Sequence, residues 1–362
     1  MPVSDRIALE SAAQFELGGR AVSATAFGSG HINDTFALTV EKPASDAYVR
    51  FVLQRINPHV FPNPLAVMDN IVRVTRHLRE KYAILPDAGR RVLTVVPAKD
   101  AKPCWFDEDG ACWRCYRMIE DAGTIDAVRG PAQARTASFA FARFARDLSD
   151  LPPPRLQETI PAFHDTPARL RALDVIANED RLGRVASAAP ELAEIDAMRH
   201  LAPLITDAFA AGLIPERITH NDTKINNVML DNATGEAICV VDLDTVMPGL
   251  ALYDFGDLVR VAANPAREDA GKLKKLEARR DMYDACTEGF LAGFDGYLTE
   301  QELKLMPIAG AVITFELAVR FLSDYLDGDR YFKTARPGHN LDRARTQIVL
   351  ARSLENLART AS

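Results

Sequence analysis

The most informative stretch of the sequence reads HNDTKINN and occupies residues 220–227. Its Asp222 is followed five positions later by Asn227, so a carboxylate and an amide oxygen stand near the two ends of one short loop. A carboxylate can accept the proton of an incoming hydroxyl, and an amide oxygen is a ligand that Mg²⁺ accepts. We therefore predict that this loop serves both a nucleophile and a metal ion.

A β-hairpin is expected directly after the loop. Apolar runs at 228–230 and 238–241 flank the turn-forming sequence DNATG at 231–235. Asp242 follows the second run, where a hairpin returns the chain to its starting point, and it is predicted to be the second metal ligand. Asp244 lies on the same strand face by the two-residue period, and it ranks behind Asp242 as an assisting ligand or a turn cap.

This combination of loop and hairpin has the spacing of the catalytic elements of protein-kinase-like enzymes, in which His-x-Asp precedes the metal-binding Asn. On that pattern Asp222 is the catalytic base, and Asn227 with Asp242 holds the magnesium of ATP. Lys224, two residues beyond the base, would neutralise charge on the transferred phosphoryl group, against the alternative of a solvated lysine. A chance surface turn is disfavoured because two separate elements agree.

A second kinase-like motif, Asp254-Phe255-Gly256, is interpreted differently. It spells the metal motif of protein kinases, but its setting LYDFGDL resembles the start of a helix rather than the exit of a hairpin. We expect Asp254 to cap a helix or to contact the catalytic loop, and not to bind magnesium.

The fold class predicted from hydrophobic periodicity is α+β, bilobal and protein-kinase-like, with an antiparallel-sheet first lobe and a mainly helical second lobe. The first lobe, residues 1–119, is expected to bind nucleotide and to contain one helix at 63–82. The hinge is predicted at about 116–121, and the second lobe at 122–362. Strands are expected at 21–27, 31–40, 48–55, 91–96 and 113–119. Helices are expected at 138–148, 190–210, 273–290 and 299–326, the last with a capping box of Thr299 and Glu302.

Nucleotide contacts in the first lobe are expected from two places. Gly28, Ser29 and Gly30 lie between the first two predicted strands and could direct backbone N–H groups at phosphates. A glycine-rich hairpin turn, however, needs no ligand to explain it. The sequence also departs from the phosphate-binding motif, because Asn33 stands where the motif has its third glycine. The strand FVLQR at 51–55 places Gln54 or Arg55 where a kinase has its lysine. Strand alternation allows one of that pair to face the nucleotide.

Composition and charge exclude several classes of function. The 362 residues are 48% hydrophobic and 26% charged, with a net charge of −7, which argues against nucleic acid or an anionic membrane as the main partner. Neither a basic segment followed by an apolar run at the N-terminus nor a membrane-spanning apolar stretch is evident, so a cytoplasmic protein is expected. The five cysteines are expected to be reduced and structural, because the CWRC stretch at 112–115 has no second pair or histidine cluster to complete a zinc site.

Four segments resemble a known family: GSGHIN at 28–33, FHDTP at 163–167, the run 219–260, and RFLSDYL at 320–326 continuing to YF at 331–332. The chain resembles the aminoglycoside-phosphotransferase-like kinases, and within them it is most similar to the members that act on N-acetylhexosamines. The resemblance spans nearly the whole chain. The catalytic motifs are shared by the superfamily, whereas the run 219–260 and the segment 320–332 are more specific.

The resemblance implies ATP- and Mg²⁺-dependent phosphorylation of the anomeric C1 hydroxyl of N-acetylglucosamine or N-acetylgalactosamine, which gives a sugar 1-phosphate. It also implies a hinge at 116–120 whose backbone meets adenine. The residues that the resemblance implies as sugar contacts are His31, Asp222, Arg320, Asp324 and Tyr331. Those that it implies as nucleotide contacts at the hinge are Met118 and Glu120.

Alternatives stay open at this stage. Arg320 can equally pair with Glu316 or Asp324, one helical turn away on either side, and Tyr331 can be a core aromatic residue. The acceptor can be another small alcohol, such as choline, homoserine or an aminoglycoside. A nucleotide-binding pseudokinase is suggested by the missing strand lysine, but such a protein normally lacks at least one of the three residues predicted to act as base and metal ligands. The choice between the two sugars and the oligomeric state are not predicted.

Overall fold

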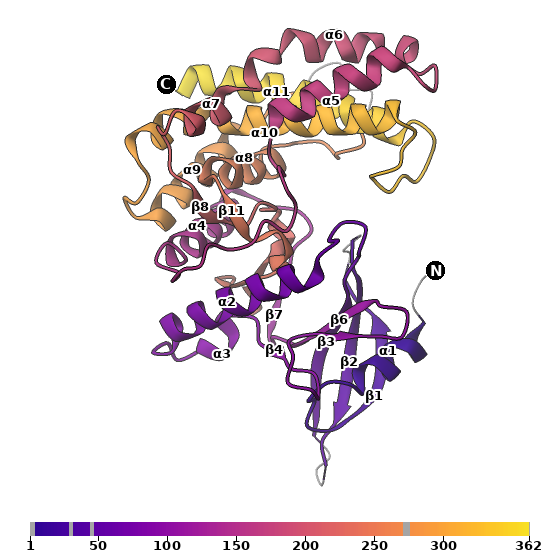
Figure 1. The fold of residues 1–362 in the computed structure, drawn as a ribbon. Helices are drawn as coiled ribbons and strands as arrows, with labels where there is room; N and C mark the ends of the chain where they lie inside the picture. The colour runs from indigo at the N-terminus through magenta and orange to yellow at the C-terminus, as the bar shows by residue number, and fades with distance from the viewer. Residues whose placement is uncertain (1–3, 29–31, 44–46, 271–275, 362) are drawn as a thin grey trace. The chain divides into compact units, whose positions relative to one another are not determined.

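The computed structural model describes residues 4–28, 32–43, 47–270 and 276–361, which form two compact units. The first unit consists of residues 1–123, 150–161 and 229–247, and the second of residues 124–149, 162–228 and 248–362. Each unit is therefore assembled from several stretches of the chain, as the colours of Figure 1 show.

The first unit is built on an antiparallel sheet with the strand order β1-β2-β3-β6-β4, and β5 pairs with β6 at the side (Figure 1). Its strands are β1 (Arg20–Ala26), β2 (Asp34–Glu41), β3 (Tyr48–Arg55), β4 (Val95–Val96), β5 (Trp105–Phe106) and β6 (Cys112–Arg117). Alternating apolar side chains of β2 and β3 point to one face, which is why these segments form strands with one buried side. The antiparallel sheet predicted for this part of the chain is confirmed.

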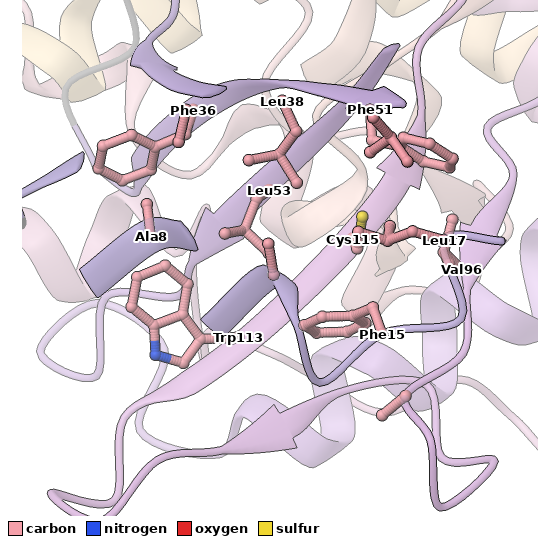
Figure 2. Packing of buried hydrophobic residues seen from close by; sticks show 14 residues of the cluster. Ala8, Phe15, Leu17, Phe36, Leu38, Phe51, Leu53, Val96, Trp113 and Cys115 are labelled. Carbon is pink, nitrogen blue, oxygen red and sulfur yellow. The ribbon is translucent and has the colours of Figure 1, made fainter. Parts of the chain in front are cut away.

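Three helices accompany this sheet: α1 (Asp5–Ala12), α2 (Pro64–Tyr82) and α3 (Ala88–Arg91). Figure 2 shows the core between α1 and the sheet, where Phe36, Leu38 and Leu53 pack with Phe15 and Trp113. The helix predicted at 63–82 is confirmed, with Asn63 as the residue whose side chain caps its first turn. The strand expected at 91–96 is reduced to Val95–Val96, because α3 ends at Arg91 and β4 is an edge strand that pairs with β6 alone within the described sheet.

The predicted hairpin is present as β9 (Val228–Asp231) and β10 (Ala237–Val240). β9 also pairs with β7 (Ala122–Gly123), and Ile238 and Cys239 pack against Ile119. The hairpin was expected as an insertion in the helical part of the chain, but these contacts make it part of the first unit. The difference arises because its apolar face is covered by the residues that follow β6.

The second unit is mainly helical, as predicted. Its helices are α4 (Pro131–Asp147), α5 (Thr166–Glu179), α6 (Ala189–Ala197), α7 (Leu204–Ala210), α8 (Ala251–Ala262), α9 (Arg280–Phe294), α10 (Glu300–Leu326) and α11 (His339–Ala361). Short 3₁₀ turns lie at Val185–Ala188, Arg199–Leu201, Ile225–Asn227 and, in the first unit, Leu243–Thr245, and a two-stranded sheet joins β8 (Arg217–Thr219) to β11 (Met247–Gly249).

Helix α10 is the central helix of this unit and runs beside α8 and α11 (Figure 1). It is long and apolar enough to cross a membrane by length and composition, but 72% of its most apolar window is buried inside the protein, as in the core helix of a globular unit. Its start has the capping box predicted from the sequence, since the Thr299 hydroxyl accepts from the Glu302 amide and the Glu302 carboxylate accepts from the Thr299 amide.

Candidate active site

The loop at 220–227 connects β8 to β9 and has a constrained backbone. Asn221 adopts a left-handed conformation with φ of 63°, and its side chain bonds to the Thr219 hydroxyl and carbonyl, at 3.0 and 3.2 Å. Asparagine tolerates this conformation better than most residues because its short amide bonds locally to the backbone. The chain therefore turns sharply just before Asp222.

The loop is held from beneath by Asp254 of α8. Its buried carboxylate accepts the backbone N–H groups of His220 and Asn221 at 2.8 and 2.7 Å, and its carbonyl accepts the Thr223 hydroxyl at 2.7 Å. Burial raises the pKa of Asp254 to about 6, against the opposing effect of His220 and the two N–H donors. This confirms the prediction that Asp254 contacts the catalytic loop.

A second support comes from His164, in a segment that sequence reasoning noted only for its resemblance. One ring nitrogen lies 2.9 Å from the Glu316 carboxylate of α10, and the other lies 3.2 Å from the Asn221 carbonyl. The ring also stacks on Tyr253, with centroids 4.9 Å apart. His164 thus ties the turn before Asp222 to the central helix of the unit.

Asp222 stands at the tip of the loop with a charged partner. The Lys224 ammonium lies 2.9 Å from one oxygen of its carboxylate. Burial alone would raise the pKa of Asp222, but the positive charges of Lys224, His220 and Arg260 outweigh burial and lower it. The carboxylate of Asp222 is therefore ionised near neutral pH, as a proton acceptor must be.

Asn227 closes the loop through its amide nitrogen, which donates to the Asp222 carbonyl at 2.9 Å. Because the nitrogen is used in this way, the amide oxygen is the side-chain acceptor that Asn227 can offer to a ligand. The structure thus brings together three of the predicted residues, Asp222, Lys224 and Asn227, within one loop.

An aromatic and cationic cluster adjoins this loop through Phe163, the neighbour of His164. The guanidinium of Arg320 lies over the rings of Phe163, Tyr331 and Phe332, at 5.3, 5.7 and 5.6 Å from their centroids, and 3.4 Å separates it from the Tyr331 hydroxyl. Arg169 lies near enough to Arg320 for the two charges to interact, and burial together with that repulsion lowers the pKa of Arg169. We call these five residues the Arg320 cluster.

The carboxylates next to Arg320 on α10 are used elsewhere. Glu316 binds His164 and the Thr166 hydroxyl, and Asp324 accepts the backbone N–H groups of residues 330–332 and the Asn340 amide. Among the residues that the structure describes, neither carboxylate forms an ion pair with Arg320. Asp324, predicted as a sugar contact, thus has the geometry of a residue that shapes the turn carrying Tyr331, which is 57% exposed.

The second predicted metal ligand, Asp242, belongs to the first unit. It follows β10, adopts a left-handed conformation with φ of 59°, and its side chain is exposed. Asp244 differs completely: it is buried, one oxygen binds the guanidinium of Arg114, and the other accepts the Asn33 amide at 2.7 Å. The predicted ranking of the two carboxylates therefore has a structural basis in their surroundings.

The predicted nucleotide residues of β3 are both engaged. Gln54 donates to the Thr35 hydroxyl at 3.0 Å and accepts from Arg114 at 2.9 Å, and Arg55 binds the Asp34 carboxylate at 2.7 Å. Arg114 of β6 is thus the cation beside Asp244, one strand away from the position where a kinase has its lysine. Gly28 has a left-handed φ of 82°, whereas Ser29, Gly30 and His31 lie outside the described residues.

At the predicted hinge, the backbone N–H of Met118 donates to the Arg50 carbonyl at 3.1 Å. The carbonyl of Met118 is therefore its backbone group that could accept a hydrogen bond from adenine. The Glu120 carboxylate pairs with Arg50, and its carbonyl accepts from Arg90 at 3.2 Å. The nucleotide role of both residues stays a prediction.

Sequence reasoning missed Arg114, Arg169, Phe163 and Phe332. Arg114 has one usable signal, since a charged residue in the middle of an apolar strand requires a buried partner. Phe163 and Arg169 lie about 150 residues before Arg320, so only the fold brings them together, whereas Phe332 follows the predicted sugar contact Tyr331 directly and had that neighbour as its signal.

An antiparallel-sheet unit, a helical unit and an Asp–Asn loop fixed to a helix from below are the parts of a protein-kinase-like phosphotransferase. In agreement, the model of the phosphotransferase enzyme family matches residues 23–287, and the chain belongs to that family. Its members transfer phosphoryl groups, so the chain is a phosphotransferase.

Solved structures with the same fold cover nearly the whole chain. An aminoglycoside phosphotransferase from Alicyclobacillus acidocaldarius has a TM-score of 0.61 at 15% identity, over 99% of this chain and 96% of that one. A spectinomycin phosphotransferase solved with ADP and spectinomycin has a TM-score of 0.61 at 11% identity, over 99% and 100%. A choline kinase from Cryptosporidium parvum has a TM-score of 0.53 at 11% identity, over 97% and 95%. The predicted protein-kinase-like fold is confirmed; identities this low carry no information on the acceptor.

Proposed function

We propose that the protein is an N-acetylhexosamine 1-kinase, which transfers the γ-phosphoryl group of ATP to the anomeric hydroxyl of N-acetylglucosamine or N-acetylgalactosamine. The observation that carries this proposal is the Arg320 cluster beside the catalytic loop. It supports a neutral, hydroxyl-rich acceptor that stacks on aromatic rings and accepts hydrogen bonds from arginine.

The cluster also argues against cationic acceptors. In sites for quaternary ammonium groups, aromatic rings receive the cation of the ligand. Here the guanidinium of Arg320 occupies that position over three rings, and Arg169 adds a second positive charge nearby. Choline and aminoglycosides would be repelled by these charges, so they are the weaker alternatives.

The chemistry assigned to the loop is proton removal and alignment. Asp222 accepts the proton of the C1 hydroxyl while the hydroxyl oxygen of the sugar forms a bond to the γ-phosphorus of ATP. The bond between the γ-phosphorus and the oxygen that bridges it to the β-phosphate breaks, and ADP leaves. Lys224 holds the carboxylate of Asp222 in place and supplies positive charge near the transferred group. The protein itself forms no covalent intermediate on this proposal.

Magnesium fits the donor atoms available. Asn227 presents an amide oxygen, Asp242 an exposed carboxylate, and the two flank the β9–β10 hairpin; such hard oxygen ligands, completed by phosphate oxygens, suit Mg²⁺. A bound Mg²⁺ would neutralise charge on the phosphates and orient them. The proposal places the reaction in the cytoplasm, where ATP is supplied.

Phosphorus NMR of the purified protein with Mg-ATP tests the acceptor directly. N-acetylglucosamine, N-acetylgalactosamine, choline and spectinomycin are supplied in turn, and a sugar 1-phosphate signal is expected with at least one of the two sugars. A phosphocholine or phospho-spectinomycin product, with both sugars inert, would reject the sugar assignment and keep the phosphotransferase class.

The matched variant for this experiment is Asp222→Asn, which keeps the size of the side chain and removes the proton acceptor. We expect kcat to fall by about 10²- to 10⁴-fold, the usual contribution of a positioned base, with an unchanged circular dichroism spectrum. Near-normal turnover by this variant would show that Asp222 is not the base.

A further inference from the structure

The buried carboxylate of Asp244 lies at the end of a polar ladder that crosses the sheet of the first unit. Thr35 of β2, Gln54 of β3 and Arg114 of β6 are cross-strand partners, so their side chains share one face. Hydrogen bonds run from Gln54 to Thr35 at 3.0 Å and from Arg114 to Gln54 at 2.9 Å, and Arg114 then binds Asp244.

Asp244 is bound on its other side by Asn33, which follows the glycine-rich stretch at 28–30. The Asn33 amide nitrogen donates to Asp244 at 2.7 Å, while its oxygen accepts the Asn57 N–H at 3.0 Å. Asn33 is the residue that stands in place of the third glycine of the phosphate-binding pattern. Its side chain thus connects the residues just before β2 to the segment that follows β10.

The backbone around Asp244 is fixed as well. The Thr159 hydroxyl donates to the Asp244 carbonyl at 2.9 Å, and the Asn70 amide donates to the Val246 carbonyl at 3.0 Å. Asp242, two residues before Asp244 and in a left-handed conformation, begins this fixed segment. Because both oxygens of Asp244 are occupied and its side chain is 2% exposed, direct metal binding by Asp244 would require these contacts to break.

We propose that Arg114, Asp244 and Asn33 form a positioning triad that holds the Asp242 carboxylate in the orientation for binding Mg²⁺, in place of an anchor based on a strand lysine. Arg114 is 1% exposed, so it acts through Asp244 and not by touching phosphate. Asp242 is linked to the triad through the backbone, because it directly precedes the 3₁₀ turn Leu243–Thr245 that contains Asp244. Burial alone would lower the pKa of Arg114, but Asp244, Tyr116 and Asp242 outweigh burial and raise it. This inference rests on the proposed metal role of Asp242.

The test is a titration of Mn²⁺ into the protein with saturating ADP, followed by the electron paramagnetic resonance signal of free Mn²⁺. Residues that orient metal ligands typically contribute 10- to 100-fold in affinity, so Arg114→Met and Asn33→Ala are each expected to raise the dissociation constant for Mn²⁺ by about that factor. Asn33→Ala removes one partly exposed amide and is the variant that keeps the test valid if Arg114→Met does not fold.

The control is Arg345→Met, which breaks arginine–carboxylate ion pairs with Glu191 and Asp342 in the second unit, at 2.7 and 3.2 Å, and involves neither the triad nor the loop at 220–227. This control is expected to bind Mn²⁺ like the wild type. If folded Arg114→Met or Asn33→Ala bound Mn²⁺ with the affinity of the wild type, the triad would be rejected. If, in addition, Asp244→Asn alone lost the metal, Asp244 would be a direct metal ligand. A wild-type protein that binds no Mn²⁺ with ADP would reject the metal site itself, whereas failure to phosphorylate the sugars leaves this inference standing.

Discussion

Asp254 combines two requirements that oppose each other. Its carboxylate is 2% exposed, so the ionised form loses hydration, yet two backbone N–H groups of the catalytic loop need an acceptor with two oxygens. The raised pKa of about 6 expresses this balance, because burial exceeds the effect of the donors. The loop is thus held in place at a cost to stability near neutral pH.

A pH dependence of stability follows from this residue. Its pKa rises from 3.8 in the unfolded chain to about 6 in the folded protein, so its stabilising contribution is complete below pH 3.8 and is lost as the pH rises through about 6. Relative to Asp254→Asn, which does not titrate, the free energy of unfolding of the wild type should increase by about 2 kcal/mol between pH 7 and pH 4. Urea denaturation of both proteins at each pH measures the difference, and a constant difference would contradict the assignment.

Arg320 is the residue that should distinguish sugar binding from catalysis. Arg320→Met keeps a long apolar side chain against the three rings and removes the charge and the N–H donors. A hydrogen bond from a charged group contributes about 1.5–3 kcal/mol, so kcat/KM for the sugar should fall by about 10- to 100-fold. The KM for ATP should be nearly unchanged; an equal loss for ATP would indicate general misfolding of the site.

At the scale of elements, the structure gives each residue of the Asp-Phe-Gly sequence in α8 a packing or hydrogen-bonding role. Asp254 supports the catalytic loop, Phe255 is fully buried beside Phe290, and Gly256 faces the backbone of α10. A Cβ atom at Gly256 would stand 2.5 Å from the Ala309 carbonyl oxygen. Each of the three letters thus has a packing reason of its own within a helix.

This close approach predicts the result of Gly256→Ala. Alanine favours the helix intrinsically by about 1 kcal/mol, but a contact of 2.5 Å with a carbonyl oxygen of the backbone must be relieved by moving α8 away from α10. We expect a net loss of about 1–3 kcal/mol in the free energy of unfolding. Gly296→Ala is not a suitable control because of its left-handed φ, whereas a Cβ atom at Gly89, inside α3, meets nothing within 4 Å, so Gly89→Ala should not destabilise the protein. A Gly256→Ala protein as stable as the wild type would show that the two helices separate at no cost.

The elements with strong local signals could be predicted from the sequence. Strand β3 was predicted with its observed bounds, and the capping box fixed the start of α10. The helix expected at 190–210 is instead divided into α6, a 3₁₀ turn and α7, because Pro203 lacks the N–H that a continuous helix requires. Periodicity of apolar residues does not register such a break.

In the candidate site, too, residues close in sequence could be predicted as a group and residues far apart in sequence could not. The residues of the loop at 220–227 are close in sequence, so their spacing alone identified Asp222, Lys224 and Asn227 as one group. The triad could not be predicted, because Asn33, Arg114 and Asp244 come from three distant segments and the strand register decides their contact. The partners of Gln54, a predicted nucleotide contact, could not be predicted for the same reason, because Thr35 and Arg114 lie on the neighbouring strands.

At the scale of the whole molecule, ligand binding should appear as stabilisation. A ligand bound only by the folded protein at 100 times its dissociation constant stabilises by about 2.7 kcal/mol. Mg-ADP should therefore raise the midpoint of thermal unfolding by several degrees, and chelation of the metal with EDTA should remove part of that shift. The shift in Asp242→Asn should be insensitive to EDTA, and an EDTA-sensitive shift of wild-type size in this variant would reject Asp242 as a ligand.

The division of the chain has a consequence for inheritance. The chain passes between the units after Gly123, Ser149, Pro161, Val228 and Met247, so neither unit corresponds to one continuous stretch of a gene. A recombination event that exchanged residues 1–123 would separate Arg114 from the carboxylate that neutralises it, encoded far downstream. New acceptor specificities in such a protein should therefore arise by substitutions that leave both units intact. Chimaeras that join the first part of one distant relative to the remainder of another should rarely be active enzymes.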